Sequence, residues 1–149
     1  MKRLIVCGAF CLLSFLSFSQ MLTPVTWDFS VEKNGQNEFT LLFTADVNPG
    51  WVIYSQYLES DDGPIPTQFT YEQSAGIQLI GANEEVGHLK TEYDDLFQMN
   101  LKKLSGKVIF KQKVKGKSGT KLNGYLTYMT CDSERCLPPV DVDFDLTLP

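Results

Sequence analysis

Apolar and polar residues alternate along much of the chain, the pattern of β-strands with one buried and one solvated face. Near the C-terminus, apolar residues occupy one set of alternate positions: Val140, Val142, Phe144, Leu146 and Leu148. Polar residues occupy the positions between them: Asp141, Asp143, Asp145 and Thr147. A second alternating segment, 38–47, follows the turn signal Asn34-Gly35-Gln36-Asn37. Residues 25–47 are therefore predicted to form a β-hairpin.

Further short strands fit the segments 67–72, 77–80, 107–115 and 121–130. Seven to nine short strands at this spacing predict an all-β, immunoglobulin-like antiparallel sandwich, with a small barrel as the alternative. The segment 86–101 lacks a strand rhythm, and we predict an ordered loop there. Such a loop either carries function or plugs the end of the sandwich.

The first 19 residues are predicted to be a secretory signal peptide. Two basic residues precede the largely apolar stretch 4–18, and Ser17 and Ser19 are the small residues that a cleavage site requires. The stretch has 15 residues, fewer than the roughly 20 that span a bilayer. We therefore expect residues 20–149 to form a single periplasmic or secreted domain, without membrane insertion after the signal is removed.

The charge balance argues against nucleic acid as a partner. The 149 residues include 13 Lys and Arg against 18 Asp and Glu, so no basic excess is available to neutralise phosphates. Hydrolase chemistry is also disfavoured, because His88 is the sole histidine and the sequence has no G-x-S-x-G motif. The 43% apolar content is sufficient for a real core.

Cys131 and Cys136 are the cysteines that remain after the predicted signal, and in an oxidising compartment we expect them to form a disulfide. In the chain-entropy model, a ring of about six residues stabilises a fold by only roughly 2 kcal/mol. Asp132 and Glu134 disfavour a thiolate at Cys131, whereas Arg135 favours one at Cys136. These residues alone leave open both a structural bridge and a reversible redox pair.

A soft metal site is a third alternative for these sulfurs. Four residues have side chains that bind copper: His88, Met129, Cys131 and Cys136. However, His88 lies 43 residues before Cys131, and the spacing matches no known copper geometry. We therefore expect neither a metal nor another cofactor.

The cysteine segment contains Tyr128-Met129-Thr130-Cys131 and ends in Cys136-Leu137-Pro138-Pro139. This ending resembles the Cys-aromatic-Pro-Pro motif of the N-terminal periplasmic domains of DsbD, a thiol:disulfide interchange protein. Gly50-Trp51-Val52-Ile53-Tyr54 is similar to that family's Gly-Tyr-Tyr-Leu-Tyr strand, and Asp94-Asp95-Leu96-Phe97 to its cap loop. Two departures are the four residues between the cysteines, where the family often has five, and Leu96 in place of an aromatic.

The resemblance implies a redox relay that needs a separate electron donor. A thioredoxin-like or membrane donor protein would reduce the disulfide, and the electrons would pass to oxidised periplasmic client proteins. Cys136 would form the mixed disulfide with a partner, and Cys131 would resolve it. Tyr54 would lie near the disulfide, Arg135 beside Cys136, and the segment Asp94-Asp95-Leu96-Phe97 would cover the pair.

The leading alternative is an extracytoplasmic binding module with an inert disulfide. In that interpretation, four aromatic residues form an apolar or sugar-binding surface: Trp51, Tyr54, Tyr57 and Phe97. Alternation places Trp51, Ile53 and Tyr57 on one strand face, which favours a core position for them. Trapping of mixed disulfides at Cys136 distinguishes the two functions.

Overall fold

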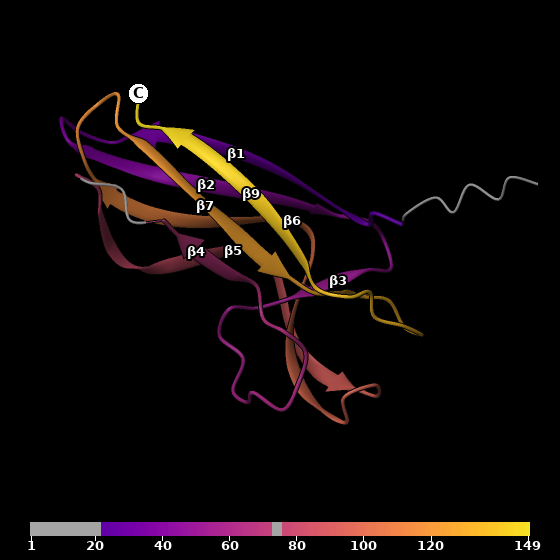
Figure 1. The fold of residues 1–149 in the computed structure, drawn as a ribbon. Coiled ribbons are helices and arrows are strands. Elements are labelled where there is room, and N and C mark those ends of the chain that lie inside the picture. Colours follow the sequence, from indigo (N-terminus) through magenta and orange to yellow (C-terminus); the bar gives the residue numbers. More distant parts are fainter. Residues whose placement is uncertain (1–21, 73–75) are drawn as a thin grey trace, which may run out of the picture.

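The computed structural model describes residues 22–72 and 76–149, which form two antiparallel β-sheets and no helix (Figure 1). The larger sheet, sheet A, has the order β1-β2-β6-β3-β8, with β5 also paired to β6, and the smaller, sheet B, has the order β4-β7-β9. The strands are β1 (Val25–Lys33), β2 (Glu38–Val47), β3 (Val52–Tyr54), β4 (Gln68–Tyr71), β5 (Gln78–Asp94), β6 (Met99–Lys115), β7 (Lys121–Tyr128), β8 (Thr130–Cys131) and β9 (Val140–Thr147). The predicted all-β sandwich and the 25–47 hairpin are confirmed. The predicted signal peptide, residues 1–19, lies outside the described residues.

β6 is the central strand of sheet A and is paired along both edges. β5 follows one edge from Met99 to Lys115. The other edge is shared by β2, which pairs with residues 107–115, and β3, which pairs with Lys103 and Leu104. A side chain on β6 is therefore positioned by a strand on each side.

The main core lies between the two sheets and is built from alternate residues, as the period-two pattern predicts. Its buried members include Phe39, Leu41, Phe43, Val108, Phe110, Val114, Leu122, Leu126, Phe144 and Leu146. The ring centroid of Phe43 is 4.7 Å from that of Phe69 and 4.9 Å from that of Phe144. The aromatic side chains of both sheets therefore meet at Phe43. Within sheet B, β4 and β7 approach closely at Gly124, where an added Cβ would overlap the carbonyl oxygen of Thr70.

The prediction of a loop over residues 86–101 is wrong, because most of that segment is strand. β5 continues to Asp94 and β6 begins at Met99, so only residues 95–98 form the loop. Residues 86–91 are all exposed, so this part of β5 has no buried apolar face. It is kept in the strand conformation by its pairing with β6. Register shifts between Ile80 and Glu84 and between Val86 and His88 interrupt the period further. The hairpin that β5 and β6 form extends past the end of sheet B (Figure 1).

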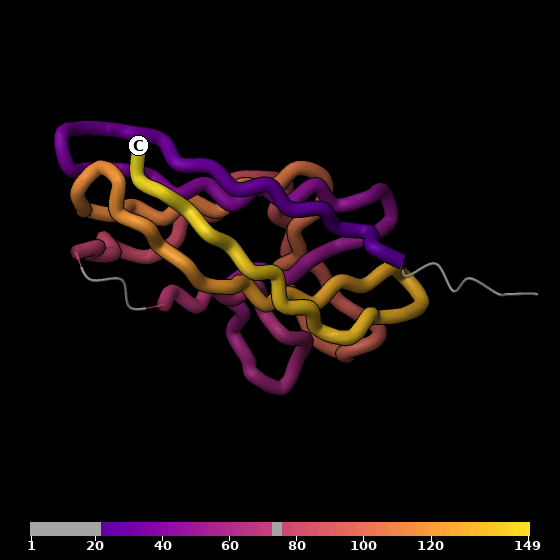
Figure 2. Tube along the Cα trace, turned by 45° about the horizontal axis from the view of Figure 1, so that its top comes forward, coloured from indigo at the N-terminus to yellow at the C-terminus, as the bar shows by residue number. Residues whose placement is uncertain are grey.

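The strand predicted over 121–130 is interrupted at Met129. β7 ends at Tyr128 in sheet B, whereas β8, Thr130–Cys131, pairs with β3 in sheet A. After the cysteine segment the chain returns to sheet B as β9, at one end of the sandwich (Figure 2). The segment that carries both cysteines therefore crosses between the sheets and back.

Candidate functional site

Cys131 and Cys136 form a disulfide in a narrow antiparallel turn. Their Cα atoms are 4.0 Å apart, and the two residues form an isolated β-bridge. The N–H of Asp132 donates to the carbonyl of Arg135, and the N–H of Leu137 donates to the carbonyl of Thr130, each at 2.9 Å. Backbone hydrogen bonds therefore hold this turn together in addition to the sulfur–sulfur bond.

The disulfide lies on the face of sheet A that is turned away from the main core. Successive residues of a strand point to opposite faces, and Ile53 belongs to the main core. Val52, which pairs with Cys131, and Tyr54 therefore point to the other face. A second apolar cluster forms there from Tyr54, Leu101 and Cys131, flanked by Val52, Leu58, Phe97, Met99, Met129 and Cys136. The disulfide thus has a packing environment of its own.

The two cysteines differ in exposure. Cys131 is only 1% exposed, whereas Cys136 is half-buried at the side of the cluster. Thiol–disulfide exchange depends on the access of a thiolate to one sulfur of the pair. Cys136 is the more accessible of the two.

The loop between β5 and β6 covers the cluster. Oδ1 of Asp94 accepts hydrogen bonds from the N–H groups of Leu96 and Phe97, at 2.9 and 3.1 Å, which fixes the turn as an Asx turn. Gln98 completes the turn with a φ of 55°. Phe97 meets Tyr54 edge to face, with ring centroids 6.1 Å apart, while Leu96 is 47% exposed. Phe97, rather than Leu96, packs on the cluster.

Tyr54 and Asp94 lie beneath this loop and have shifted acidities. Burial, followed by the nearby Asp94 carboxylate, raises the pKa of Tyr54 well above its usual range. The Tyr54 hydroxyl forms no hydrogen bond to a described residue. Burial alone would raise the pKa of Asp94, but the Lys103 ammonium and the N–H groups of Phe97 and Leu96 outweigh it and lower that pKa. A neutral phenol and an ionised carboxylate therefore lie under the loop at neutral pH.

Arg135 is positioned by the turn itself. Oδ1 of Asp132 accepts the N–H groups of Glu134 and Arg135, both at 2.9 Å, and these bonds help to lower the pKa of Asp132. The guanidinium of Arg135 lies over the Trp51 ring, 5.9 Å from its centroid, and its Nε is 3.5 Å from Oδ2 of Asp132. A cation is thus held on the residue that precedes Cys136.

Comparison with known proteins identifies the family. The family model described as Thiol:disulfide interchange protein DsbD, N-terminal, matches residues 19–148. The chain belongs to the DsbD N-terminal family. Membership of this family and the Cys131–Cys136 disulfide together support thiol–disulfide exchange.

Two solved structures share the fold of this DsbD N-terminal chain. The N-terminal domain of DsbD from Neisseria meningitidis, in its reduced form, has a TM-score of 0.59 at 16% identity, over 85% of this chain and 90% of that one. The N-terminal periplasmic domain of ScsB from Proteus mirabilis has a TM-score of 0.59 at 19% identity, over 83% of this chain and 46% of that one. The immunoglobulin-like sandwich predicted from the sequence is confirmed. A search of the curated proteins gave no match.

Several of the predicted site residues of this DsbD N-terminal domain come together in space. Tyr54 and Phe97 pack with the disulfide, whereas Asp95 and Leu96 lie at the exposed end of the loop. The prediction that Tyr57 shares a strand face with Ile53 is wrong, because β3 ends at Tyr54 and Tyr57 is 45% exposed. The aromatic residues do not form a single surface.

Sequence reasoning missed three residues of the disulfide cluster, Leu58, Met99 and Leu101, and also Lys103, which pairs with Asp94 of the covering loop. Leu58 belongs to the β3–β4 loop, residues 55–67, and Gly63 of the same loop lies against Met99, where an added Cβ would be 3.0 Å from Sδ. This loop lies beside the β5–β6 hairpin (Figure 1). Leu101-Lys102-Lys103-Leu104 places one leucine and one lysine on each face of the strand, so no apolar–polar alternation marks Leu101 or Lys103 as site residues.

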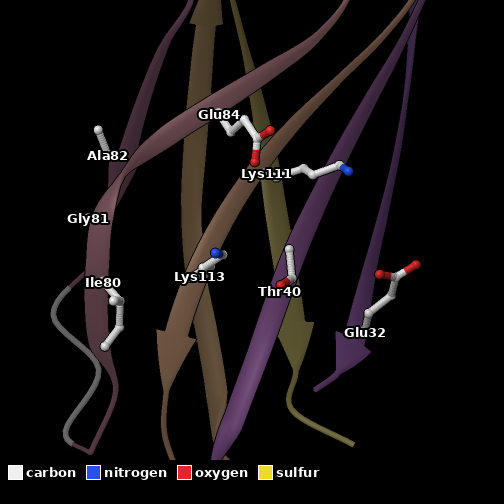
Figure 3. Close-up of a pocket in the computed structure, with 8 residues that line it drawn as sticks. All are labelled: Glu32, Thr40, Ile80, Gly81, Ala82, Glu84, Lys111 and Lys113. Atoms are coloured by element: carbon white, nitrogen blue, oxygen red, sulfur yellow. The ribbon is translucent and has the colours of Figure 1, made fainter. Parts of the chain in front are cut away.

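A separate hollow lies on sheet A, beside β5 and β6 (Figure 3). It is lined by Glu32, Thr40, Ile80, Gly81, Ala82, Glu84, Lys111 and Lys113. These residues flank the 111–113 part of β6, whereas the disulfide cluster contacts the part that begins at Met99. Within residues 22–72 and 76–149, no group of three His, Cys, Asp or Glu side chains is placed to hold a metal. The same residues contain no helix that could span a membrane.

Removal of the Phe97 ring is expected to uncover Cys136. An edge-to-face aromatic pair contributes about 0.5–1.5 kcal/mol beyond its buried area, so Phe97→Ala should increase the open fraction of the loop roughly tenfold. The measurement is the rate at which iodoacetamide alkylates Cys136 after reduction. Leu96→Ala is the matched control, because Leu96 is already 47% exposed. Equal alkylation rates in both variants and the wild type would argue against a shielding role.

Proposed function

We propose that this chain is a periplasmic thiol–disulfide relay, exported by its signal peptide and folded as a single domain over residues 20–149. It accepts electrons from a thioredoxin-like or membrane donor protein and passes them to oxidised client proteins. The observation that carries this proposal is the asymmetric disulfide, with Cys131 buried and Cys136 half-buried beside a small covering loop. The disulfide closes only a six-residue ring within a hydrogen-bonded turn, so the fold depends little on it.

Reduction of the chain is a two-step exchange. A thiolate of the donor dithiol attacks Sγ of Cys136, the bond to Cys131 breaks, and the Cys131 sulfur leaves as a thiolate that takes up a proton. The second donor thiolate then attacks the donor sulfur of the mixed disulfide and releases Cys136. The donor loses two electrons and two protons and becomes a disulfide, and the chain gains both as a dithiol.

Reduction of a client runs in the same order. Arg135 stabilises the Cys136 thiolate, which attacks one sulfur of the client disulfide and releases the other as a thiolate. The apolar cluster around Cys131 favours its neutral thiol until the mixed disulfide has formed. Cys131 then loses its proton and attacks Sγ of Cys136, so the client leaves with two thiols and the chain regains its disulfide.

A thiol count tests the proposed relay. We expect the oxidised chain, mixed with a reduced thioredoxin-like donor and separated from it, to show two new free thiols per molecule. Cys136→Ser is the control, because its lone Cys131 thiol gives a constant background. No increase in the wild-type chain under conditions where the donor reduces another protein disulfide would refute the relay.

A further inference from the structure

Lys103 lies beneath the covering loop, on the central strand β6. Its Nζ is 3.0 Å from Oδ2 of Asp94, the residue that begins the loop, and the two side chains are only 13% and 7% exposed. The other oxygen of the same carboxylate, Oδ1, accepts the backbone N–H groups of Leu96 and Phe97. A single carboxylate therefore joins the Lys103 side chain to the backbone of the loop.

The strand register fixes Lys103 in this place. It is opposite Tyr54 on β3 and opposite Lys90 on β5, so both neighbouring strands hold its backbone. The adjacent Lys102 points to the other face of the sheet, where its Nζ contacts the carbonyl of Tyr57 and the carboxylate of Glu59. Lys102 therefore cannot replace Lys103 as the partner of Asp94.

We propose that Lys103 is a positioning residue for the exchange reaction: through Asp94, it holds the β5–β6 loop closed over the Cys131–Cys136 disulfide. The inference deepens the proposed function and rests on it for the identity of Cys136 as the attacked sulfur. Without the ammonium, the buried Asp94 carboxylate lacks its countercharge, which favours a conformation in which the carboxylate is solvated. Such a movement lifts Phe97 away from Tyr54 and exposes the disulfide.

Three other ionisable groups face this ion pair. Oε1 of Glu92 is 3.4 Å from Nζ of Lys103, and Nζ of Lys90 is 2.6 Å from Oε2 of Glu92. The Lys90 and Glu92 side chains are 64% and 37% exposed, so water solvates both. The third group, the Tyr54 phenol, stays neutral because its pKa is raised. Asp94 is therefore the group whose charge the closed loop requires.

The test is the rate at which the phosphine TCEP reduces the disulfide of the full oxidised chain. At neutral pH we expect Lys103→Met to be reduced at least about tenfold faster than the wild type, because one partner of a buried ion pair is lost. Lys103→Arg should restore slow reduction. Lys90→Met, which removes an exposed lysine on the same face, should stay within about twofold of the wild type.

The pH dependence separates this role from general loosening of the fold. The pKa of Asp94 is lowered, so its pairing with Lys103 is present at neutral pH and is lost as the pH falls through that pKa. The ratio of the Lys103→Met rate to the wild-type rate cancels the pH dependence of the reagent. It should fall towards one in acid, whereas a general packing defect would keep it constant.

A folded Lys103→Met variant that is reduced at the wild-type rate overturns the proposal. If that variant does not fold, Asp94→Asn serves in its place, since the amide oxygen still accepts the N–H groups of the turn but carries no charge. An unchanged rate in Asp94→Asn overturns the proposal equally. Faster reduction of Lys103→Met, combined with no reduction of the wild type by a donor protein, refutes the relay and leaves the role of Lys103 standing.

Discussion

Cys131→Ala is expected to accumulate mixed disulfides with cellular proteins, whereas Cys136→Ala should accumulate almost none. Cys136 is the accessible sulfur, and without Cys131 no intramolecular thiol remains to resolve the bond it forms. Intramolecular attack by a well-placed group has an effective molarity of about 10⁵ M or more, so loss of Cys131 should lengthen the lifetime of the intermediate by orders of magnitude. Cys131 alone, at 1% exposure, cannot readily reach a partner.

The measurement is a non-reducing gel of cells quenched with acid and alkylated, followed by identification of the trapped proteins. The double variant, with both cysteines replaced by alanine, provides the background. Equal trapping by the two single variants would show that the exposure of the sulfurs does not set their roles. If neither variant traps a protein while both remain folded, the disulfide is a structural bridge and the binding-module alternative gains support.

The fold class could be predicted from sequence because the strands of the main core have one buried and one solvated face. β9 and the hairpin 25–47 illustrate this, since alternate residues such as Phe43 and Phe144 pack between the sheets. The outer part of β5, residues 86–91, is exposed throughout and has no such face. Its conformation follows from hydrogen bonds to β6, and local residue patterns do not encode the presence of a partner strand.

The candidate site was predictable only in part. Cys131, Cys136 and the loop with Phe97 are contiguous motifs, which a resemblance can identify without knowledge of the fold. Lys103 carries no local signal among the many lysines of 102–121, because its importance arises from the register of β3 and β5 with β6. Long-range pairing, rather than the residue type, brings it to Asp94.

Phe43→Ala is expected to lower the free energy of unfolding by about 3–5 kcal/mol and to leave the reactivity of the disulfide in the folded protein unchanged. The Phe43 side chain is fully buried, and its ring packs with those of Phe29, Phe69 and Phe144. Its removal leaves a cavity in the main core. Phe43 belongs to the main core, whereas the disulfide belongs to the separate cluster on the opposite face of sheet A.

Leu42→Ala is the matched control for Phe43→Ala, since Leu42 is adjacent to Phe43 in the sequence and lies half-buried on the opposite face of β2. Its loss should destabilise the fold by only about 1 kcal/mol. Urea unfolding measures the stability of each variant, and TCEP reduction at low temperature measures the reactivity of the native disulfide. Phe97→Ala should show the reverse combination, with little loss of stability and a large gain in reactivity. If Phe43→Ala instead accelerates native-state reduction as much as Phe97→Ala does, the main core and the covering loop form one cooperative unit, and local opening of the loop does not control access to Cys136.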